Sequence, residues 1–231
     1  MCHCVIKVLE GRFSCILKIF IKGVANKHSA RMNDFSVWSH HWEASESLLF
    51  LLQHSELHEN MKLLELGSGT GRVALEMQKK CTMVASDGVV DAVEAMRRKG
   101  IKNSILLDWS DEKFADSFDL IFGSDLCYEA GTAHVLNALL KRLNASMLLF
   151  TSPPMRMQFF DLVELLKLSY ATVVFKRIEA PNCEPAVAVV CHSGERSKLF
   201  ASIVELMERF EKQAAIVLAK DIPHPPPPPP L

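Results

Sequence analysis

The chain reads Lys62-Leu-Leu-Glu-Leu-Gly-Ser-Gly-Thr-Gly71 near the end of its first third, and this stretch decides the fold. Its first five residues, 62–66, are mostly apolar and predict a buried strand. The glycines that follow allow a sharp turn, and the amphipathic stretch 71–80 predicts a helix directly after it. A strand, a glycine turn and a helix in this order are typical of a parallel α/β sheet.

The same alternation continues along the chain. Short apolar runs predict further strands at 83–86, 104–107, 118–122, 147–151, 171–175 and 186–191, and amphipathic stretches predict helices at 90–99, 133–143 and 155–168. We therefore predict an α/β fold of three layers, in which helices cover both faces of a seven-stranded, mostly parallel sheet. Only a loop separates the last two strands, which favours a hairpin and hence one antiparallel edge strand.

The two ends of the chain depart from this pattern. Residues 1–35 form a basic extension, because residues 1–31 contain six basic side chains and one acidic side chain. The α/β domain is expected at 36–196, an extra amphipathic helix at 197–221 and a polyproline II tail at 222–231. The tail is a candidate ligand for an SH3-, WW- or profilin-like partner, and a solvated tail without a partner is the alternative.

Composition limits the classes of function. Hydrophobic residues make up 49% of the chain, charged residues 23%, and the formal net charge is −1. Such a chain can build a large core and has no overall attraction to nucleic acid or to an anionic membrane. Seven cysteines without regular spacing indicate a reducing compartment. We expect a monomer in the cytoplasm with access to the nucleus, and the basic N-terminus makes mitochondria the alternative.

Side chains suited to a nucleoside ligand follow the predicted strands. The glycine loop is not a dinucleotide fingerprint, because position 72 is arginine where that pattern needs glycine. Asp87 ends the second strand, where a carboxylate can accept hydrogen bonds from both ribose hydroxyls or cap the next helix. Trp109 follows the third strand, where its ring can line an adenine site or pack in the core.

An acidic residue before a Gly-x-Gly-x-Gly loop resembles the first motif of the class I, seven-β-strand methyltransferases that use S-adenosylmethionine. The resemblance implies a Rossmann-like methyltransferase domain over 36–196 with S-adenosylmethionine as its cofactor. No metal is expected, because no cluster of His and carboxylate ligands lies beside the motif. The cofactor-binding residues that the resemblance implies are Trp42, Glu65, Gly67, Ser68, Gly69, Asp87, Trp109 and Ser124.

The sequence after the fourth strand narrows the resemblance. Asp125-Leu-Cys-Tyr128 is similar to the Asp-x-x-Tyr/Phe element of the methyltransferase-like protein-lysine methyltransferases called family 16. These also have a tryptophan followed by small residues before the first strand. Trp42 fits this element, and Trp38 is the rival alignment. Arg156 and the aromatic residues after it are similar to the family's segment after the fifth strand, whereas Arg72 departs from the family, whose first helix often opens with an apolar residue.

The resemblance implies an enzyme that methylates a protein, with a lysine of a non-histone protein as the expected acceptor and histidine or arginine nitrogen as alternatives. Asp125 and Tyr128 are its implied catalytic residues. Asp125 would attract and orient the amine, and Tyr128 would form a wall of the site and accept a hydrogen bond. The alternative functions are a small-molecule methyltransferase and an inactive cofactor-binding scaffold that acts through the polyproline tail.

Overall fold

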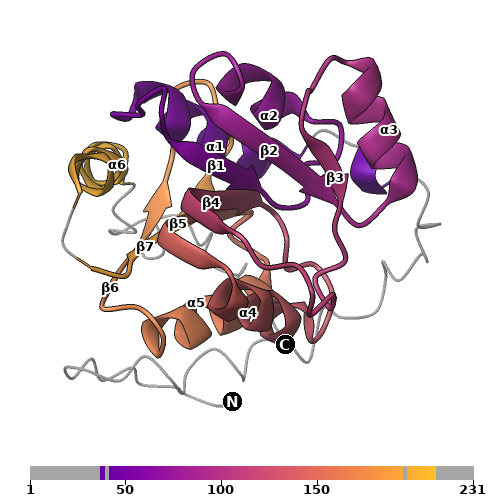
Figure 1. Cartoon of the computed structure of the whole chain (residues 1–231). Coiled ribbons are helices and arrows are strands. Elements are labelled where there is room, and N and C mark those ends of the chain that lie inside the picture. The colour runs from indigo at the N-terminus through magenta and orange to yellow at the C-terminus, as the bar shows by residue number, and fades with distance from the viewer. Residues whose placement is uncertain (1–36, 40–41, 195–196, 212–231) are drawn as a thin grey trace, which may run out of the picture. The chain divides into compact units, whose positions relative to one another are not determined.

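The computed structural model describes residues 37–39, 42–194 and 197–211, and a seven-stranded sheet forms its middle layer. The strands are β1 Lys62–Glu65, β2 Thr82–Asp87, β3 Ser104–Leu106, β4 Ser117–Ser124, β5 Asn144–Ser152, β6 Thr172–Ile178 and β7 Ala186–His192. The helices are η1 Val37–Ser39, α1 Glu43–His54, α2 Arg72–Met77, α3 Val90–Arg98, α4 Thr132–Arg142, α5 Met157–Lys167 and α6 Lys198–Arg209. Figure 1 shows them on both sides of the sheet.

The strand order is β3-β2-β1-β4-β5-β7-β6, and the first five strands of that order pair in parallel. The predicted seven-stranded, mostly parallel sheet is therefore confirmed. The antiparallel pairing expected near one edge is also present. β7 pairs antiparallel with both β5 and β6, and it lies between them. A hairpin after α5 thus inserts its second strand into the sheet and leaves its first strand at the edge.

Two apolar clusters fill the spaces between the layers. On one face, side chains from α1, α2, α3 and α6 pack on the sheet, and on the other face those from α4 and α5 do so. Neighbouring residues of one strand point to opposite clusters, as Leu63 and Leu64 of β1 do, and both are fully buried. Strands buried on both faces need apolar residues at almost every position, which explains the continuous apolar runs in the sequence.

Two helices differ from what the sequence pattern predicts. The apolar run 48–52 does not reveal α1 by its periodicity, since a continuous apolar run fits a buried strand equally well. The sequence predicts the C-terminal helix over 197–221, but α6 ends at Arg209, and Glu211 forms a β-bridge with Ile178 instead. α6 belongs to the core, because its apolar side chains, including Phe200, lie in the same cluster as those of α1.

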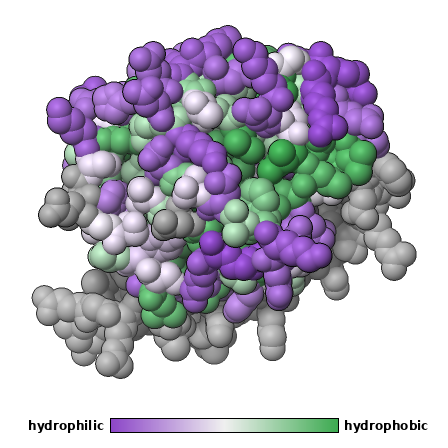
Figure 2. Space-filling model, in the orientation of Figure 1, coloured by the Kyte–Doolittle hydropathy of each residue, from purple (hydrophilic) through white to green (hydrophobic). Residues whose placement is uncertain are grey.

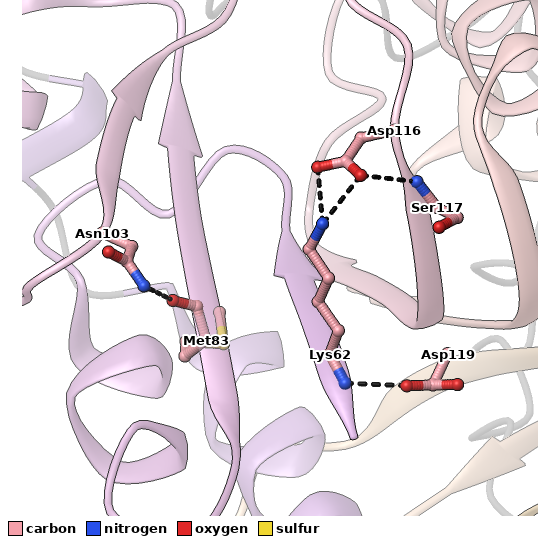
Figure 3. Close-up of polar contacts among 6 residues, drawn as sticks. All are labelled: Lys62, Met83, Asn103, Asp116, Ser117 and Asp119. Carbon is pink, nitrogen blue, oxygen red and sulfur yellow. Dashed lines mark hydrogen bonds and ion pairs between the residues drawn. The ribbon is translucent and has the colours of Figure 1, made fainter. Parts of the chain in front are cut away.

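A polar network holds the start of β1 at the edge opposite the glycine loop (Figure 3). The Lys62 ammonium contacts both carboxylate oxygens of Asp116 at 2.7 and 2.6 Å, and the Lys62 backbone N–H donates to Asp119 at 2.7 Å. Nearby, the Asn103 amide donates to the Met83 carbonyl at 3.2 Å. These groups are exposed or half-buried, and they sit at the amino ends of the strands. We therefore assign them to fixing the sheet, not to chemistry.

The predicted basic extension at 1–35 and the polyproline tail at 222–231 lie outside the described residues, so both stay predictions. Among the described helices, none combines the length and the apolar character needed to cross a membrane.

Gly71 makes the turn from β1 into α2 testable. Its φ is +75°, and a Cβ built on it would lie 2.3 Å from Ile101 Cδ1. Gly100 has a similar φ of +83° but open space around it. We expect Gly100→Ala to lower the free energy of unfolding by about 1–2 kcal/mol, through backbone strain alone. Gly71→Ala should lower it by roughly 1–3 kcal/mol more, through overpacking. Urea denaturation of both variants measures the difference, and equal losses would contradict the packing argument.

Candidate active site

The sheet changes its direction of winding between β1 and β4. These strands are parallel neighbours, with Glu65 opposite Phe122, but α2 packs on one face of the sheet and α4 on the other. The loops that follow the two strands therefore diverge at the carboxyl edge, which is where ligands bind in open α/β sheets. The residues predicted for cofactor and acceptor follow these strands and their neighbours.

The glycine loop after β1 is closely packed by neighbouring segments. A Cβ on Gly67 would lie 2.7 Å from Leu126 Cδ2, and one on Gly69 would lie 2.8 Å from the Trp38 carbonyl oxygen. Both glycines have positive φ values, +60° and +51°. A side chain at either position would thus be strained and would fill space beside the loop. Glycine at both positions therefore lets Leu126 and Trp38 approach the loop backbone closely.

Glu65 ends β1 as a buried carboxyl group with one unsatisfied oxygen. Among the described residues, Oε2 has no hydrogen-bond partner. Desolvation by burial raises the pKa of Glu65 from 4.5 to about 8, and hydrogen bonds from Ser68 and from the Ala74 backbone offset this only in part. A buried oxygen without a partner is costly, so its presence indicates a place for a ligand donor or cation.

Asp87 at the end of β2 holds the glycine loop. The Gly69 N–H donates to Oδ2 at 2.8 Å, and the Val89 N–H donates to Oδ1 at 2.9 Å. Burial raises the pKa of Asp87 in spite of these bonds. Each carboxylate oxygen has a second lone pair, so the group can still accept a ligand hydroxyl. Ser68 adds a link between the strands, because its hydroxyl accepts from the Ser86 N–H at 3.2 Å.

Trp109 lies beside the same loop. Its ring atom Cζ2 is 4.0 Å from the Cβ position of Gly67, and the residue is half-buried. On the side of β3 and α3, the space-filling view shows apolar residues at the surface (Figure 2). Leu106 ends β3, Val90 begins α3 and Val89 precedes it, and all three are exposed. An indole ring and an apolar border next to Asp87 suit the ring and sugar of a nucleoside.

Asp125 follows β4 and forms an ion pair with Arg156, which the sequence did not predict. Arg156 donates to both of its carboxylate oxygens, from Nε at 2.8 Å and from Nη2 at 2.9 Å. The Asp125 side chain is only 1% exposed. The residue also has a positive φ of 48°, and its N–H donates to the Thr151 carbonyl at 2.9 Å. The negative charge of Asp125, which was expected to attract an incoming ammonium, is thus already neutralised by Arg156.

The two tryptophans before β1 have different places. Trp42 precedes α1, and the Arg156 guanidinium carbon lies 5.7 Å from the centroid of its ring. The carbonyl oxygen of Trp38 lies beside Gly69 of the glycine loop. The buried indole N–H of Trp38 has no hydrogen-bond partner among the described residues. Trp42 therefore lies beside Arg156, whereas Trp38 contacts the glycine loop.

The remaining predicted residues lie close to Asp125 in the chain. Ser124 is half-buried at the end of β4, and Tyr128 is 49% exposed in the loop that follows. Leu126 connects this segment with the glycine loop, because it lies beside Gly67 and follows Asp125 directly. Local sequence pattern does not reveal the contact between Arg156 and Asp125. It depends on the pairing of β4 with β5, which brings the segments after the two strands together.

The buried Glu65 predicts how stability depends on pH. The folded state keeps a proton that the unfolded state loses, so the free energy of unfolding should fall as pH rises from 4.5 to about 8, by up to about 1.4 kcal/mol per pH unit. Glu65→Gln cannot ionise and should lose this part of the slope. Urea denaturation between these pH values measures both chains. Equal slopes would show that Glu65 ionises in the folded protein as it does in the unfolded chain.

Comparisons with known proteins agree with this geometry. The family model described as lysine methyltransferase matches residues 27–158, more than half of the chain. No curated protein matches the sequence. Among solved structures, the ChlM magnesium protoporphyrin IX methyltransferase of Synechocystis PCC 6803, with bound S-adenosylmethionine, is 11% identical at a TM-score of 0.55. It covers 72% of this chain and 92% of its own.

Two further structures share the fold. The N-methyltransferase NodS of Bradyrhizobium japonicum WM9, in complex with S-adenosyl-L-homocysteine, is 18% identical at a TM-score of 0.52 and covers 74% of this chain and 94% of its own. Mtq2 of E. cuniculi, in complex with Trm112, is 16% identical at a TM-score of 0.54 and covers 67% of this chain and 98% of its own. At such low sequence identities the structural similarity shows only the fold, and the match to the family model shows the family. The chain belongs to the lysine methyltransferase family and is a methyltransferase that uses S-adenosylmethionine.

Proposed function

We propose that this enzyme transfers the methyl group of S-adenosylmethionine to a side-chain nitrogen of a protein, with lysine as the first candidate acceptor. The observation that carries the proposal is the exposed apolar rim around Asp125 and Arg156. Tyr128 is 49% exposed, Met155 is 86% exposed, and Met157 is also exposed. Small-molecule sites enclose most of their ligand, whereas exposed aromatic and methionine side chains are typical of contacts with another protein.

The residues around the glycine loop fit the cofactor. The unpartnered oxygen of Glu65 suits the ammonium group of its methionine part, and the remaining lone pairs of Asp87 suit its ribose hydroxyls. Trp109 offers a half-buried ring to its adenine. We propose that Gly67, Ser68 and Gly69 form the floor of this half of the site, and that Ser124 and Trp42 border its acceptor end.

Bound S-adenosylmethionine would supply an electrophilic methyl group on a sulfonium. The protein's own part is to hold an unprotonated nitrogen in line with that carbon and to exclude water. A lysine amine must lose its proton before it can attack, since its ordinary pKa is about 10.4. We assign the orientation of the nitrogen to Asp125, whose carboxylate oxygens keep lone pairs for its N–H groups. Tyr128 would form the outer wall.

The cofactor half is tested by filling the space beside the loop. Gly67→Arg should abolish binding of S-adenosylmethionine and S-adenosylhomocysteine, because its side chain would start 2.7 Å from Leu126 at a strained φ. Gly100→Arg is the matched control, since it adds the same side chain at a positive φ into open space. Calorimetric titration should show binding by wild type and by the control only. Binding by Gly67→Arg at wild-type affinity would move the cofactor site elsewhere.

The acceptor half is tested by Asp125→Asn. This change keeps the shape of the side chain but removes its charge, so the ion pair with Arg156 is lost and the carboxylate no longer orients the nitrogen. Transfer of radiolabel from the cofactor into the proteins of a cell lysate should fall roughly 10²-fold or more, because misplaced reactants lose that much. Cofactor affinity should stay near wild type. Undiminished labelling by Asp125→Asn would remove Asp125 from the mechanism.

Each alternative function has its own outcome in the same assay. Label that enters only low-mass acceptors would indicate a small-molecule methyltransferase. If deletion of residues 222–231 removes a cellular effect that Asp125→Asn preserves, the chain acts as a scaffold through its tail. In the E. cuniculi structure the methyltransferase is bound to Trm112. Purification from cells would reveal a stable partner of this chain, in place of the predicted monomer. Cell fractionation would test its predicted cytoplasmic or nuclear location.

A further inference from the structure

Three segments that are distant in sequence meet at Arg156. It directly precedes α5, its guanidinium binds Asp125 at the end of β4, and its Cζ lies over the ring of Trp42 before α1. A second contact ties the same segments, because the Thr151 hydroxyl of β5 donates to the Ala44 carbonyl of α1 at 2.8 Å. Arg156 therefore fixes the position of the acceptor half from three sides.

The contact with Asp125 is a strong one. Two parallel N–H···O bonds between a guanidinium and a carboxylate add geometric precision as well as energy. The carboxylate is buried and Arg156 is only 32% exposed, so water weakens the pair less than it weakens an open surface pair. The pair raises the pKa of Arg156 further above its ordinary range. Arg156 thus stays charged, and the pair is neutral as a whole.

A neutral pair changes what the acceptor site can select. An incoming ammonium would have to displace Arg156 from two charge-assisted hydrogen bonds and from the face of Trp42. An uncharged amine gains no charge attraction from such a displacement, and it loses less hydration than an ammonium does when it enters beside a neutral pair. The arrangement therefore favours a nitrogen that has already lost its proton, which is the form that can attack a methyl group.

We propose that Arg156 is a positioning residue for methyl transfer, which cancels the charge of Asp125 and holds its carboxylate beside Trp42 so that the site admits an uncharged nitrogen. This inference rests on the proposed function, which places the acceptor at Asp125. The role is more than structural support. Arg156→Met should expose a carboxylate and an aromatic face that together bind an organic cation.

The experiment measures cation binding without any acceptor protein. Wild type, Arg156→Met and the double variant Arg156→Met/Asp125→Asn, each saturated with S-adenosylhomocysteine, are titrated with methylguanidinium and with n-butylammonium. The first cation mimics Arg156 and the second mimics lysine. Arg156→Met should bind both at least about tenfold more tightly than wild type does, and the double variant should lose this gain, since the carboxylate is the attracting group. Arg156→Lys leaves a positive partner for the buried carboxylate, so its cation binding, expected between that of wild type and of Arg156→Met, provides the test if Arg156→Met does not fold.

Methyl transfer supplies the second measurement. Labelling of lysate proteins by Arg156→Met should fall roughly 10- to 100-fold while cofactor affinity stays unchanged, and added methylguanidinium should restore part of the rate. Arg156→Lys should be intermediate, because it keeps the charge and loses the two-point contact. Arg72→Met is the matched control. It removes another two-point pair, with Glu46 on the surface, and should leave transfer and cation binding unchanged.

Two results would overturn the inference. One is binding of n-butylammonium by wild type as tightly as by Arg156→Met, which would mean that Asp125 is open to an ammonium. The other is wild-type transfer by Arg156→Met without added cation. If wild type labels no protein at all, the proposed function fails, but the titrations still decide whether Arg156 closes Asp125 to cations.

Discussion

β1 and β4 run in parallel at the centre of the sheet, and the helices that follow them pack on opposite faces. This pairing makes the two loops diverge at one edge of the sheet, where ligands bind in open α/β sheets. The glycine loop and its supports come from the β1 side, and Asp125 comes from the β4 side. Leu126 lies against the glycine loop and so connects the two sides.

The buried carboxyl groups of Glu65 and Asp125 differ in whether a cation is paired with them. Glu65 is buried without a cation, so its pKa rises to about 8 and one oxygen has no partner among the described residues. Asp125 is equally buried but is paired with Arg156 through two hydrogen bonds. Among the described residues, one oxygen of Glu65 is thus unsatisfied, whereas both oxygens of Asp125 accept hydrogen bonds. This difference supports the proposal that a charged methionine group binds at Glu65 and an uncharged nucleophile at Asp125.

The sequence predicted the parts of this arrangement that depend on local pattern. Apolar runs gave the seven strands, and Glu65 with the following glycines gave the loop, because turn geometry and strand burial are encoded nearby in the chain. The insertion of β7 between β5 and β6 was not visible, since strand order depends on packing between distant segments. The Arg156–Asp125 pair was missed for the same reason. The two residues are 31 positions apart, and only the β4–β5 pairing brings them together.

The packing of α6 decides how far the chain can be shortened from its C-terminus. Its apolar side chains cover the same face of the sheet as α1, and Lys176 of β6 forms an ion pair with Glu211 at 2.6 Å. A chain cut before Lys198 would leave that face open to water, and exposed apolar area of this kind promotes aggregation. Crystallisation and binding studies that remove the proline-rich end should therefore keep every residue through Glu211.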